Sequence, residues 1–232
     1  MFGNKKGRQP IYCVRPPIYY FTVRVKNSNI KMELELLIAT SNRGKVREIK
    51  DLFGTAPVRL RSLLDFPLIE EVPENGSTFE ENAILKARGY ALQTGLWSLA
   101  DDSGLEIAAL GNAPGVLSAR YGGDDTGFAE KMFMLLEELE RSEHEHRYAR
   151  FVCSMALAGS TGEILMTSEG ICAGTIAPLA RGNGGFGYDP MFIPNGYEMT
   201  FGELPDEVKR EISHRALASQ IIIRYLLDFM AV

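Results

Sequence analysis

The chain has 232 residues, of which 45% are hydrophobic and 24% are charged, as in an ordinary globular protein rather than a disordered one. The net charge of −5 is unevenly spread, because residues 1–31 carry seven Lys or Arg and no acid, which leaves −12 for residues 32–232. Such an acidic body argues against nucleic-acid binding, which needs a basic surface.

The N-terminal residues 1–31 precede Met32 and the first predicted strand. Pro16-Pro17 and scattered basic side chains interrupt any apolar core of a signal peptide, and the chain lacks a membrane-spanning run of about 18 apolar residues. We expect residues 1–31 to be an upstream extension outside the fold and residues 32–232 to form one domain, with a short basic binding arm as the alternative. The three cysteines form no CxxC pair, which argues against a disulfide framework or zinc site and favours a cytoplasmic location.

The first half of the chain alternates predicted strands and helices. The elements are a strand at Leu34–Thr40, a helix at Lys45–Phe53 capped by Ser41 or Asn42, a strand at Val58–Leu64, an acidic loop at Ile69–Ser77 and a helix from Thr78 to Thr94. Thr78 and Glu81 match a capping box, and Gly95 ends the second helix.

The next stretch, Leu96–Leu105, joins an apolar run to two adjacent acids, Asp101 and Asp102. The run predicts a buried strand that ends at the acids, and ligands usually bind where the strands of an open α/β sheet end. Buried acids need a cation or strong donors to offset the loss of water. A helix N-cap or Asx-turn is the alternative interpretation.

The second half predicts a helix, a hairpin and two C-terminal helices, joined by Gly-rich loops. These elements are a loop at Gly111–Asp125, a helix at Phe128–Arg141, strands at Tyr148–Ala158 and Glu163–Ala173, a loop at Arg181–Pro194, and helices at Asp206–Ile212 and Arg215–Met230. The last helix is expected to pack on the sheet through Leu217, Ile221, Leu226 and Leu227. The element order predicts one α/β domain, two-lobed, with a mixed sheet flanked by helices.

Two motifs in the first half offer cations to an anion. The motif Thr40–Lys45 lies at a strand-to-helix junction, where free N–H groups, the helix dipole and a lysine make an anion site. It does not match a Walker A loop, and a plain N-cap is the alternative. Asn82 and Lys86 lie four residues apart on one helix face, which by itself is also typical of a solvated surface.

The glycine-rich stretch Arg181–Pro190 formally matches a dinucleotide fingerprint, but no helix follows it and no βαβ unit surrounds it. It is better interpreted as a base clamp, in which Phe186 and Tyr188 stack on a base and Asp189 accepts hydrogen bonds. A flexible hairpin loop is the alternative.

Three potential cations, Lys209, His214 and Arg215, surround the start of the last helix and are compatible with recognition of a phosphate or a base edge. His144 and His146 lie in a charged run and are expected to be solvated rather than metal ligands. Together the motifs supply anion donors, acids for a hard cation and a base clamp, which indicates a magnesium–nucleoside polyphosphate site.

With these motifs the sequence resembles the inosine triphosphate pyrophosphatases, also called dITP/XTP pyrophosphatases. The motifs that carry the resemblance are ATSNRGKVREI (39–49), TFEENAILKA (78–87), ADDSGLE (100–106), APGVLSARYGG (113–123), GGFGYDPMF (184–192) and EISHRALA (211–218). They extend over residues 33–232, and residues 1–31 have no counterpart.

The resemblance implies an elongated sheet with the nucleotide site in the cleft between the two lobes, and a homodimer. It implies Mg²⁺-dependent hydrolysis of dITP, ITP or XTP between the α- and β-phosphates, with Asp102 as catalytic base and metal ligand. The implied substrate-binding residues are Thr40, Ser41, Asn42, Arg43, Gly44, Lys45, Lys86, Ser103, Phe186, Gly187, Tyr188, Asp189, Lys209, His214 and Arg215.

The family also places a second metal carboxylate in the acidic loop before the TFEEN helix. Here residues 70–76 read EEVPENG, with Pro73 at one expected acid, so Glu74 is our first choice and Glu71 the second. Deaminated purines carry a 6-oxo acceptor where adenine has a donor, so we hypothesise that a donor on His214 or Arg215 rejects adenine. A catalytically inactive nucleotide-binding regulator on the same fold is the alternative function.

Overall fold

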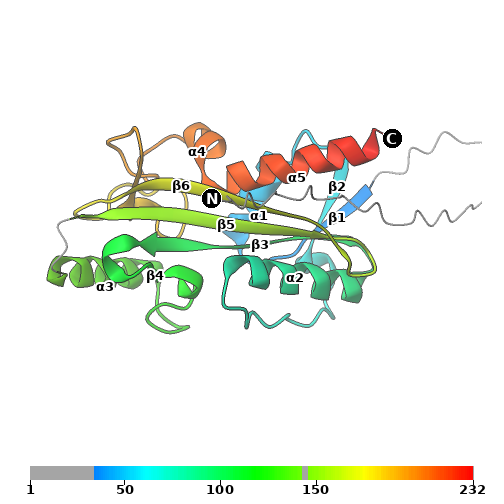
Figure 1. Cartoon of the computed structure of the whole chain (residues 1–232), viewed down its shortest axis with the longest axis horizontal. Coiled ribbons are helices and arrows are strands. Elements are labelled where there is room, and N and C mark those ends of the chain that lie inside the picture. Colours follow the sequence, from blue (N-terminus) through cyan, green and yellow to red (C-terminus); the bar gives the residue numbers. More distant parts are fainter. Residues whose placement is uncertain (1–33, 143–145, 232) are drawn as a thin grey trace, which may run out of the picture. The chain divides into compact units, whose positions relative to one another are not determined.

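A seven-stranded mixed sheet with the strand order β2-β1-β3-β5-β6-β7, and with β4 attached to β3, lies at the centre of the fold (Figure 1). The computed structural model describes residues 34–142 and 146–231, so the predictions for residues 1–31 and for His144 lie outside the described residues. The strands are β1 (Leu34–Ile38), β2 (Val58–Ser62), β3 (Trp97–Ile107), β4 (Ala113–Pro114), β5 (Tyr148–Ala158), β6 (Ile164–Ile176) and β7 (Phe192–Pro194). β1 pairs in parallel with β2 and β3, and the other pairs are antiparallel, which confirms the predicted mixed sheet.

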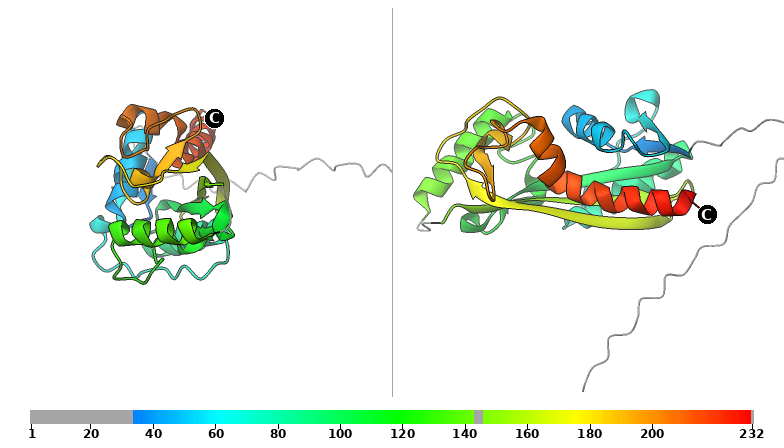
Figure 2. Two further views of the ribbon diagram at one scale, coloured as in Figure 1. Left: turned by 90° about the vertical axis from the view of Figure 1, so that its left-hand side faces the viewer. Right: turned by 90° about the horizontal axis from the view of Figure 1, so that it is seen from above.

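The helices cover both faces of the long strands (Figure 2). They are α1 (Arg43–Leu52), α2 (Phe79–Thr94), α3 (Phe128–Arg141), α4 (Asp206–Ile212) and α5 (His214–Met230). α2 packs on β3 and β5, whereas α5 packs on the opposite face, over β5 and β6. The predicted hairpin and helices are therefore confirmed, with ends that differ by only a few residues.

Local sequence signals explain where the helices begin and end. The Asn42 side chain caps α1 by accepting from the Gly44 and Lys45 N–H groups at 2.9 and 3.1 Å. Thr78 caps α2 through the Glu81 N–H at 3.1 Å, while the Glu81 carboxylate accepts from Ser77 at 2.7 Å. Gly95 ends α2 at a φ of 67°, where a side chain would be strained.

The face of α5 that packs on the sheet differs in part from the prediction. Leu226 is buried as expected, but Leu217, Ile221 and Leu227 are 36%, 42% and 47% exposed. The contact is made instead by a narrower stripe that includes Ala218 and Ile222. The helix can approach β6 closely because Gly170 has no side chain: a Cβ there would lie 2.1 Å from the His214 carbonyl oxygen. The small residue Ala218 lies where helix and strand approach most closely, and Leu217, Ile221 and Leu227 lie at the sides of the helix.

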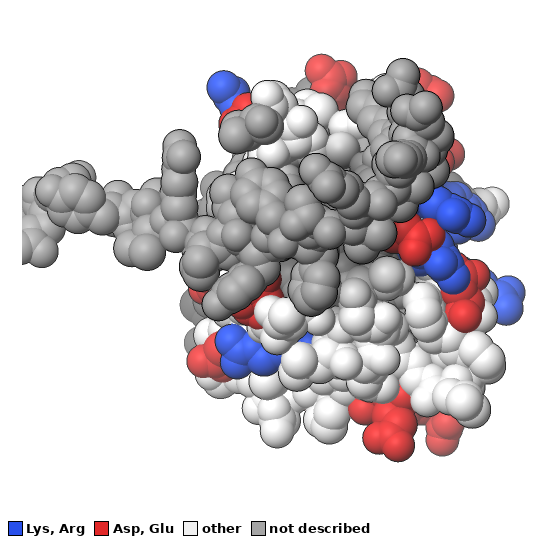
Figure 3. Space-filling view, turned by 90° about the vertical axis from the view of Figure 1, so that its right-hand side faces the viewer, with Lys and Arg blue, Asp and Glu red and all other residues white. Residues whose placement is uncertain are grey.

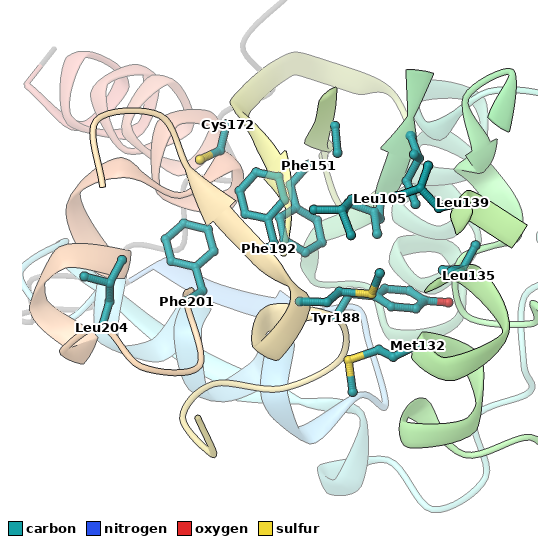
Figure 4. Packing of buried hydrophobic residues seen from close by; sticks show 14 residues of the cluster. Leu105, Met132, Leu135, Leu139, Phe151, Cys172, Tyr188, Phe192, Phe201 and Leu204 are labelled. Carbon is teal, nitrogen blue, oxygen red and sulfur yellow. The ribbon is translucent and has the colours of Figure 1, made fainter. Parts of the chain in front are cut away.

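Apolar clusters occupy the two ends of the sheet. Figure 4 shows the cluster at one end, where Leu105, Leu135, Phe151, Tyr188 and Phe192 pack together from β3, α3, β5, the segment before β7, and β7 itself. At the other end, one cluster joins β1, α1 and α5, and an alanine-rich cluster lies between α2 and the strands. The predicted fold, an α/β unit with helices on both faces of a mixed sheet, is confirmed.

The surface of the described residues carries charges of both signs. On the face shown in Figure 3, the coloured Lys and Arg side chains alternate with Asp and Glu side chains, and neither sign gathers over a large area of the described atoms. Among the described residues no helix combines the length and the apolar character needed to cross a membrane.

Candidate active site

The two adjacent acids lie within β3 rather than at its end. The strand continues from Trp97 to Ile107, which makes the prediction of a strand ending at the acids, and the alternative of an N-cap or Asx-turn, wrong. What ends here is the partner strand: β1 pairs with β3 only as far as Leu99, and β4 pairs only from Glu106 onward. Between these points one edge of β3 has no neighbouring strand, and the cavity lies along it.

This cavity has a volume of about 580 Å³ and brings together almost all the predicted site residues. The predicted residues that line it are Thr40, Ser41, Asn42, Lys45, Glu71, Glu74, Lys86, Asp102, Ser103, Phe186, Gly187, Tyr188, Asp189, Lys209, His214 and Arg215. The remaining lining residues were not predicted as site residues; these are Gly104, Val116, Ser118, Ala119, Arg120, Asp124, Phe128 and Phe151.

Two predicted substrate-binding residues, Arg43 and Gly44, do not line the cavity. Arg43 is exposed at the first position of α1. A Cβ on Gly44 would lie 2.6 Å from the Phe186 ring, so this glycine makes room for the ring against the start of α1. Gly44 lines an adjoining hollow on the far side of Phe186 instead.

Asp101 is fully buried. Its side chain points to the face of β3 that carries α1 and α5, whereas the next residue, Asp102, points to the other face, because successive side chains of a strand alternate. The Asp101 carboxylate pairs with Lys45 at 2.6 Å and with Arg215 at 2.7 Å, and the Cys153 thiol lies 3.3 Å away. Burial alone would raise the pKa of Asp101, but Arg215, Lys45 and Lys86 lower the pKa of that carboxyl well below its usual value. Asp101 therefore remains ionised and holds two cations at the cavity.

Asp102 faces α2 and lines the cavity. Asn82 donates to one carboxylate oxygen at 3.1 Å, and the Lys86 ammonium lies 3.3 Å from the other. Asn82 and Lys86 are only 1% and 5% exposed, so the alternative of a solvated helix face is wrong. Burial raises the pKa of Asp102 although Lys86 and Lys45 oppose the shift. The carboxylate is thus a poorly hydrated base with a fixed orientation.

Glu48 on α1 is a residue that the sequence analysis missed. Its carboxylate accepts from Lys209 and Arg215, two of the three cations predicted around the start of the last helix, with Lys209 at 2.6 Å. Burial would raise the pKa of Glu48, but Arg215 and Lys209 lower it below the ordinary value. An acid one turn after Lys45, just beyond the anion motif, was the available signal, because an unpaired carboxylate there would repel an anionic ligand.

Ion pairs link β3 and α1 to the glycine-rich loop across the cavity. The Arg215 guanidinium bonds Asp101, Glu48 and, at 2.8 Å, the Ser103 hydroxyl. Lys209 in turn lies 2.5 Å from Asp189 in the glycine-rich loop. Ion pairs therefore connect Lys45 of the anion motif, through Asp101, Arg215, Glu48 and Lys209, to Asp189 of the glycine-rich loop.

The glycine-rich loop is folded by its own acid rather than being a flexible hairpin. The Asp189 carboxylate accepts from the Phe186 N–H at 2.7 Å, and burial raises its pKa despite Lys209. Phe186 is half-buried, with the Lys209 ammonium 4.7 Å from the ring centroid. Tyr188 is only 3% exposed, and its hydroxyl donates to the Ser118 carbonyl at 2.8 Å. Phe186 is thus the more accessible aromatic face.

His214 is buried at the start of α5 and stacks on Phe151 with a centroid distance of 4.8 Å. Burial lowers the pKa of His214 well below its usual value, and Arg215 and Lys209 add to that shift, so the ring is neutral. Its Nδ1 atom has no hydrogen-bond partner among the described residues. A neutral ring with a free nitrogen at the cavity wall can serve a ligand as donor or acceptor.

Two carboxylates offer oxygen ligands to a cation. The Lys86 ammonium lies 3.0 Å from Glu74 and 3.3 Å from Asp102, so both acids already converge on one positive charge. Glu71 also lines the cavity, but no ion pair joins it to the described residues. No group of three or more His, Cys, Asp or Glu side chains is arranged for a metal in the described part of the chain. A pair of acids suits a hard cation that also binds phosphate oxygens and water.

Comparisons with known proteins agree with this geometry. The Ham1 family model matches residues 36–225. The dITP/XTP pyrophosphatase of Geobacillus kaustophilus is 48% identical over 184 residues, which cover 79% of this chain and 90% of that protein. That of Desulforamulus reducens is 47% identical over 188 residues, covering 80% of this chain and 92% of that protein.

Solved structures show the same fold. The HAM1 protein from Coxiella burnetii superposes with a TM-score of 0.78 at 40% identity, covering 84% of this chain and 99% of that one. The Ham1 protein of Staphylococcus aureus gives a TM-score of 0.74 at 36% identity, with the same coverage of 84% and 99%. The protein described here belongs to the Ham1 family.

Proposed function

We propose that this protein hydrolyses non-standard purine nucleoside triphosphates (dITP, ITP and XTP) to a nucleoside monophosphate and pyrophosphate, and so clears deaminated purines from the nucleotide pool. The observation that carries the proposal is the cavity beside β3, which unites an anion-binding helix start, two converging carboxylates and an aromatic clamp. Relatives named dITP/XTP pyrophosphatase, 48% and 47% identical, support it.

The proposed chemistry centres on Asp102. Asn82 contacts one of its carboxylate oxygens and Lys86 the other, and these contacts fix the orientation of the group. Asp102 orients a water molecule and accepts its proton as the water oxygen bonds the α-phosphorus and the bond to the bridging oxygen breaks. Lys45 and Lys86 neutralise charge that develops on the leaving pyrophosphate. Thr40, Ser41 and Asn42 at the start of α1 bind the phosphate chain.

Asp102 and Glu74 would hold the Mg²⁺ ion, with Glu71 as the second choice for the loop acid. When bound there, Mg²⁺ would supply positive charge at the phosphate oxygens and make water more acidic. Glu74 is favoured over Glu71 because Glu74 already shares a cation with Asp102. To test which acids hold the ion, Asp102 and Glu74 should be substituted one at a time, because removal of both would leave Lys86 without a carboxylate partner.

The base is proposed to stack on Phe186, with His214 as the group that selects it. A 6-oxo group can accept from His214 if the unpartnered Nδ1 carries the proton, whereas all three guanidinium nitrogens of Arg215 already contact protein oxygens. Unchanged ITP-to-ATP activity ratios in both His214→Ala and Arg215→Ala would contradict this role.

The direct experiment incubates the full chain with Mg²⁺ and ITP, dITP, XTP, GTP or ATP, and measures monophosphate, pyrophosphate and orthophosphate separately. We expect pyrophosphate and monophosphate from the first three nucleotides. Orthophosphate as the first product would contradict attack at the α-phosphorus. Asp102→Asn should lower kcat about 100-fold or more, because an amide cannot accept the proton. Full activity in that variant would remove Asp102 from the mechanism.

The alternative is a catalytically inactive nucleotide-binding regulator. Intact Asp102, Lys45 and Lys86, all at the cavity, argue against it. Binding of ITP without release of any product would establish the regulator instead.

We further propose that residues 32–232 form the catalytic domain, with residues 1–31 outside it, that the protein is a cytoplasmic homodimer, and that it does not bind nucleic acid. The family match at residues 36–225 supports the boundary, and the resemblance supports the dimer. The charge of −12 on residues 32–232 opposes nucleic-acid binding. Light scattering measures the oligomeric state, and steeply salt-dependent DNA binding that disappears on deletion of residues 1–31 would contradict the last point.

A further inference from the structure

Arg120 differs from the other basic side chains of the cavity. Five Lys or Arg side chains line it, namely Lys45, Lys86, Arg120, Lys209 and Arg215. Four of them pair with a carboxylate at 2.5 to 3.3 Å, whereas no ion pair joins Arg120 to the described residues. Arg120 is exposed, so its guanidinium keeps its donors free for a ligand.

The charge balance of the lining favours a role for such an unpaired cation in binding a polyanion. Five acids also line the cavity, namely Glu71, Glu74, Asp102, Asp124 and Asp189, so acids and bases are equal in number. Each paired cation is already partly neutralised by its partner, and the phosphate chain of a nucleotide must be attracted against these acids. Arg120 supplies positive charge that no internal carboxylate cancels.

The backbone beneath Arg120 is held from two directions. The Ser118 carbonyl accepts from the Tyr188 hydroxyl at 2.8 Å, and the Ala119 carbonyl accepts from the Lys131 ammonium. The Arg120 N–H itself closes a turn by donating to Leu117 at 2.8 Å. A fixed backbone under an exposed, unpaired side chain lowers the entropy cost of a ligand contact.

Lys131 strengthens this argument because it is a buried cation with no described acid as a partner. It is 2% exposed, and its ammonium contacts the Ala119 carbonyl and lies 5.2 Å from the centroid of the Phe128 ring. Burying an ammonium costs free energy unless hydrogen bonds offset the loss of water. Here the hydrogen bond to the Ala119 carbonyl also fixes the segment next to Arg120.

The segment also stands at the right place along β3. The anion motif follows β1, where Ala39 donates to Leu99 at 2.8 Å. The segment before Arg120 lies beside Gly104, since a Cβ on Gly104 would be 2.5 Å from the Gly115 carbonyl oxygen. Asp102 lies between these two points on the strand. A phosphate chain at Asp102 therefore has the anion motif toward one end of the free edge and the segment that leads to Arg120 toward the other.

We propose that Arg120 is a substrate-binding residue that donates hydrogen bonds to the phosphate chain of the nucleotide. The inference rests on the proposed function. The phosphate chain is common to all nucleoside triphosphates, so Arg120 adds affinity without selecting the base. A guanidinium can bind phosphate oxygens in pairs, which an ammonium cannot.

The test compares Arg120→Gln, Arg120→Lys and the wild-type full chain. The Kd for ITP is measured by calorimetry in metal-free buffer, and kcat/KM is measured with Mg²⁺ for ITP and ATP. Arg120→Gln should raise the Kd about tenfold or more. It should lower kcat/KM for both nucleotides by the same factor and leave the melting temperature of the free protein unchanged, because the side chain has no described ion-pair partner. Arg120→Lys should recover part of the affinity.

The matched control is Arg224→Gln, which removes the same charge from an exposed position on α5 that does not line the cavity. A Kd for Arg120→Gln within twofold of the wild-type and control values overturns the inference. A changed ITP-to-ATP ratio also overturns it, because that result places Arg120 on the base. If the wild-type protein binds ITP but releases no pyrophosphate, the proposed function fails, while the Kd comparison still decides the role of Arg120.

Discussion

At the scale of single residues, the two adjacent acids of β3 differ because of the alternation of a strand. Asp101 points to the face of α1 and α5 and holds Lys45 and Arg215, whereas Asp102 points to α2 and the cavity. One carboxylate is therefore an internal anchor, and the other is proposed to act on the substrate. The same alternation places Ser103 with Asp101, where Arg215 reaches its hydroxyl.

Asp101→Asn should lower the free energy of unfolding by about 3 kcal/mol or more, because it leaves Lys45 and the buried Arg215 facing a neutral amide. Urea denaturation followed by circular dichroism measures the change. Glu137→Gln is the control, since it breaks an exposed ion pair on α3 and should have little effect. Equal stability of the two variants would show that Asp101 is not an anchor.

His214 should make the stability of the protein depend on pH. Burial lowers the pKa of His214 in the folded state, and Arg215, Lys209 and Lys45 lower it further, whereas Asp101 opposes the shift. Below pH 6.5 the unfolded chain therefore binds a proton at this histidine that the folded protein does not bind. Stability due to this group is present above pH 6.5 and is lost as the pH falls, by up to about 1.4 kcal/mol per pH unit.

Denaturation at pH 7 and pH 5 compares the wild-type protein with His214→Gln and with the exposed control His146→Gln. The loss of unfolding free energy between pH 7 and pH 5 should be smaller in His214→Gln than in the wild-type protein, and it should be unchanged in His146→Gln. An unchanged slope in His214→Gln would mean that another group causes the acid sensitivity.

At the scale of elements, the close approach of α5 to β6 sets the positions of His214 and Arg215. His214 and Arg215 form the first turn of α5, and Ser213 caps it by accepting from the Ala216 N–H at 3.1 Å. Because Gly170 on β6 admits this turn, a residue outside the cavity determines where two cavity residues lie.

Gly170→Ala should therefore displace α5 and affect both stability and substrate binding. The new Cβ would lie 2.1 Å from the His214 carbonyl oxygen and 2.6 Å from the Ala218 nitrogen, so the helix must move. We expect a loss of about 1–3 kcal/mol and a higher KM for ITP. The control is Gly54→Ala, whose Cβ would meet only ordinary contacts at 3.5 Å. Wild-type KM and stability in Gly170→Ala would contradict the close approach.

At the scale of the whole described unit, the cavity draws its lining from both ends of the sheet. Phe151 and Tyr188 of the lining belong to the apolar cluster at one end. Toward the other end, the lining residues 40–42 lie between β1 and α1, whose Ile38 and Ile49 belong to the second cluster. The free edge of β3 runs between them and is bounded by β1 and β4. A nucleotide that fills this cavity should stabilise both ends together.

A non-hydrolysable ITP analogue should raise the melting temperature, because a ligand at 100 times its Kd adds about 2.7 kcal/mol to the stability of the native state. The increase should be larger with Mg²⁺ than with EDTA, since Glu74 and Asp102 need a cation between them and the phosphates. Differential scanning calorimetry measures both conditions. Equal shifts with and without Mg²⁺ would argue against a metal held by these acids.

Local patterns were enough to predict most elements, because helix caps, glycine stops and apolar periodicity act over a few residues. α3 and α4 have the predicted bounds, and the hairpin of β5 and β6 follows from its turn. The continuation of β3 through its acids could not be predicted, since it depends on pairing with β5, which follows about 50 residues later. The buried face of α5 was predicted only in part, because Gly170 on another element selects it.

The sequence by itself determined the family resemblance, the α/β class, and the residue types and order of the site motifs, because these depend on local chemistry. Only the tertiary structure decided which charges face each other. It separated Asp101 from Asp102, placed Glu48 between Lys209 and Arg215, and left Arg120 without a described ion-pair partner. The physical reason is that ion pairing and burial join residues more than 100 positions apart, as in Asp101 and Arg215, and no local pattern contains such a distance.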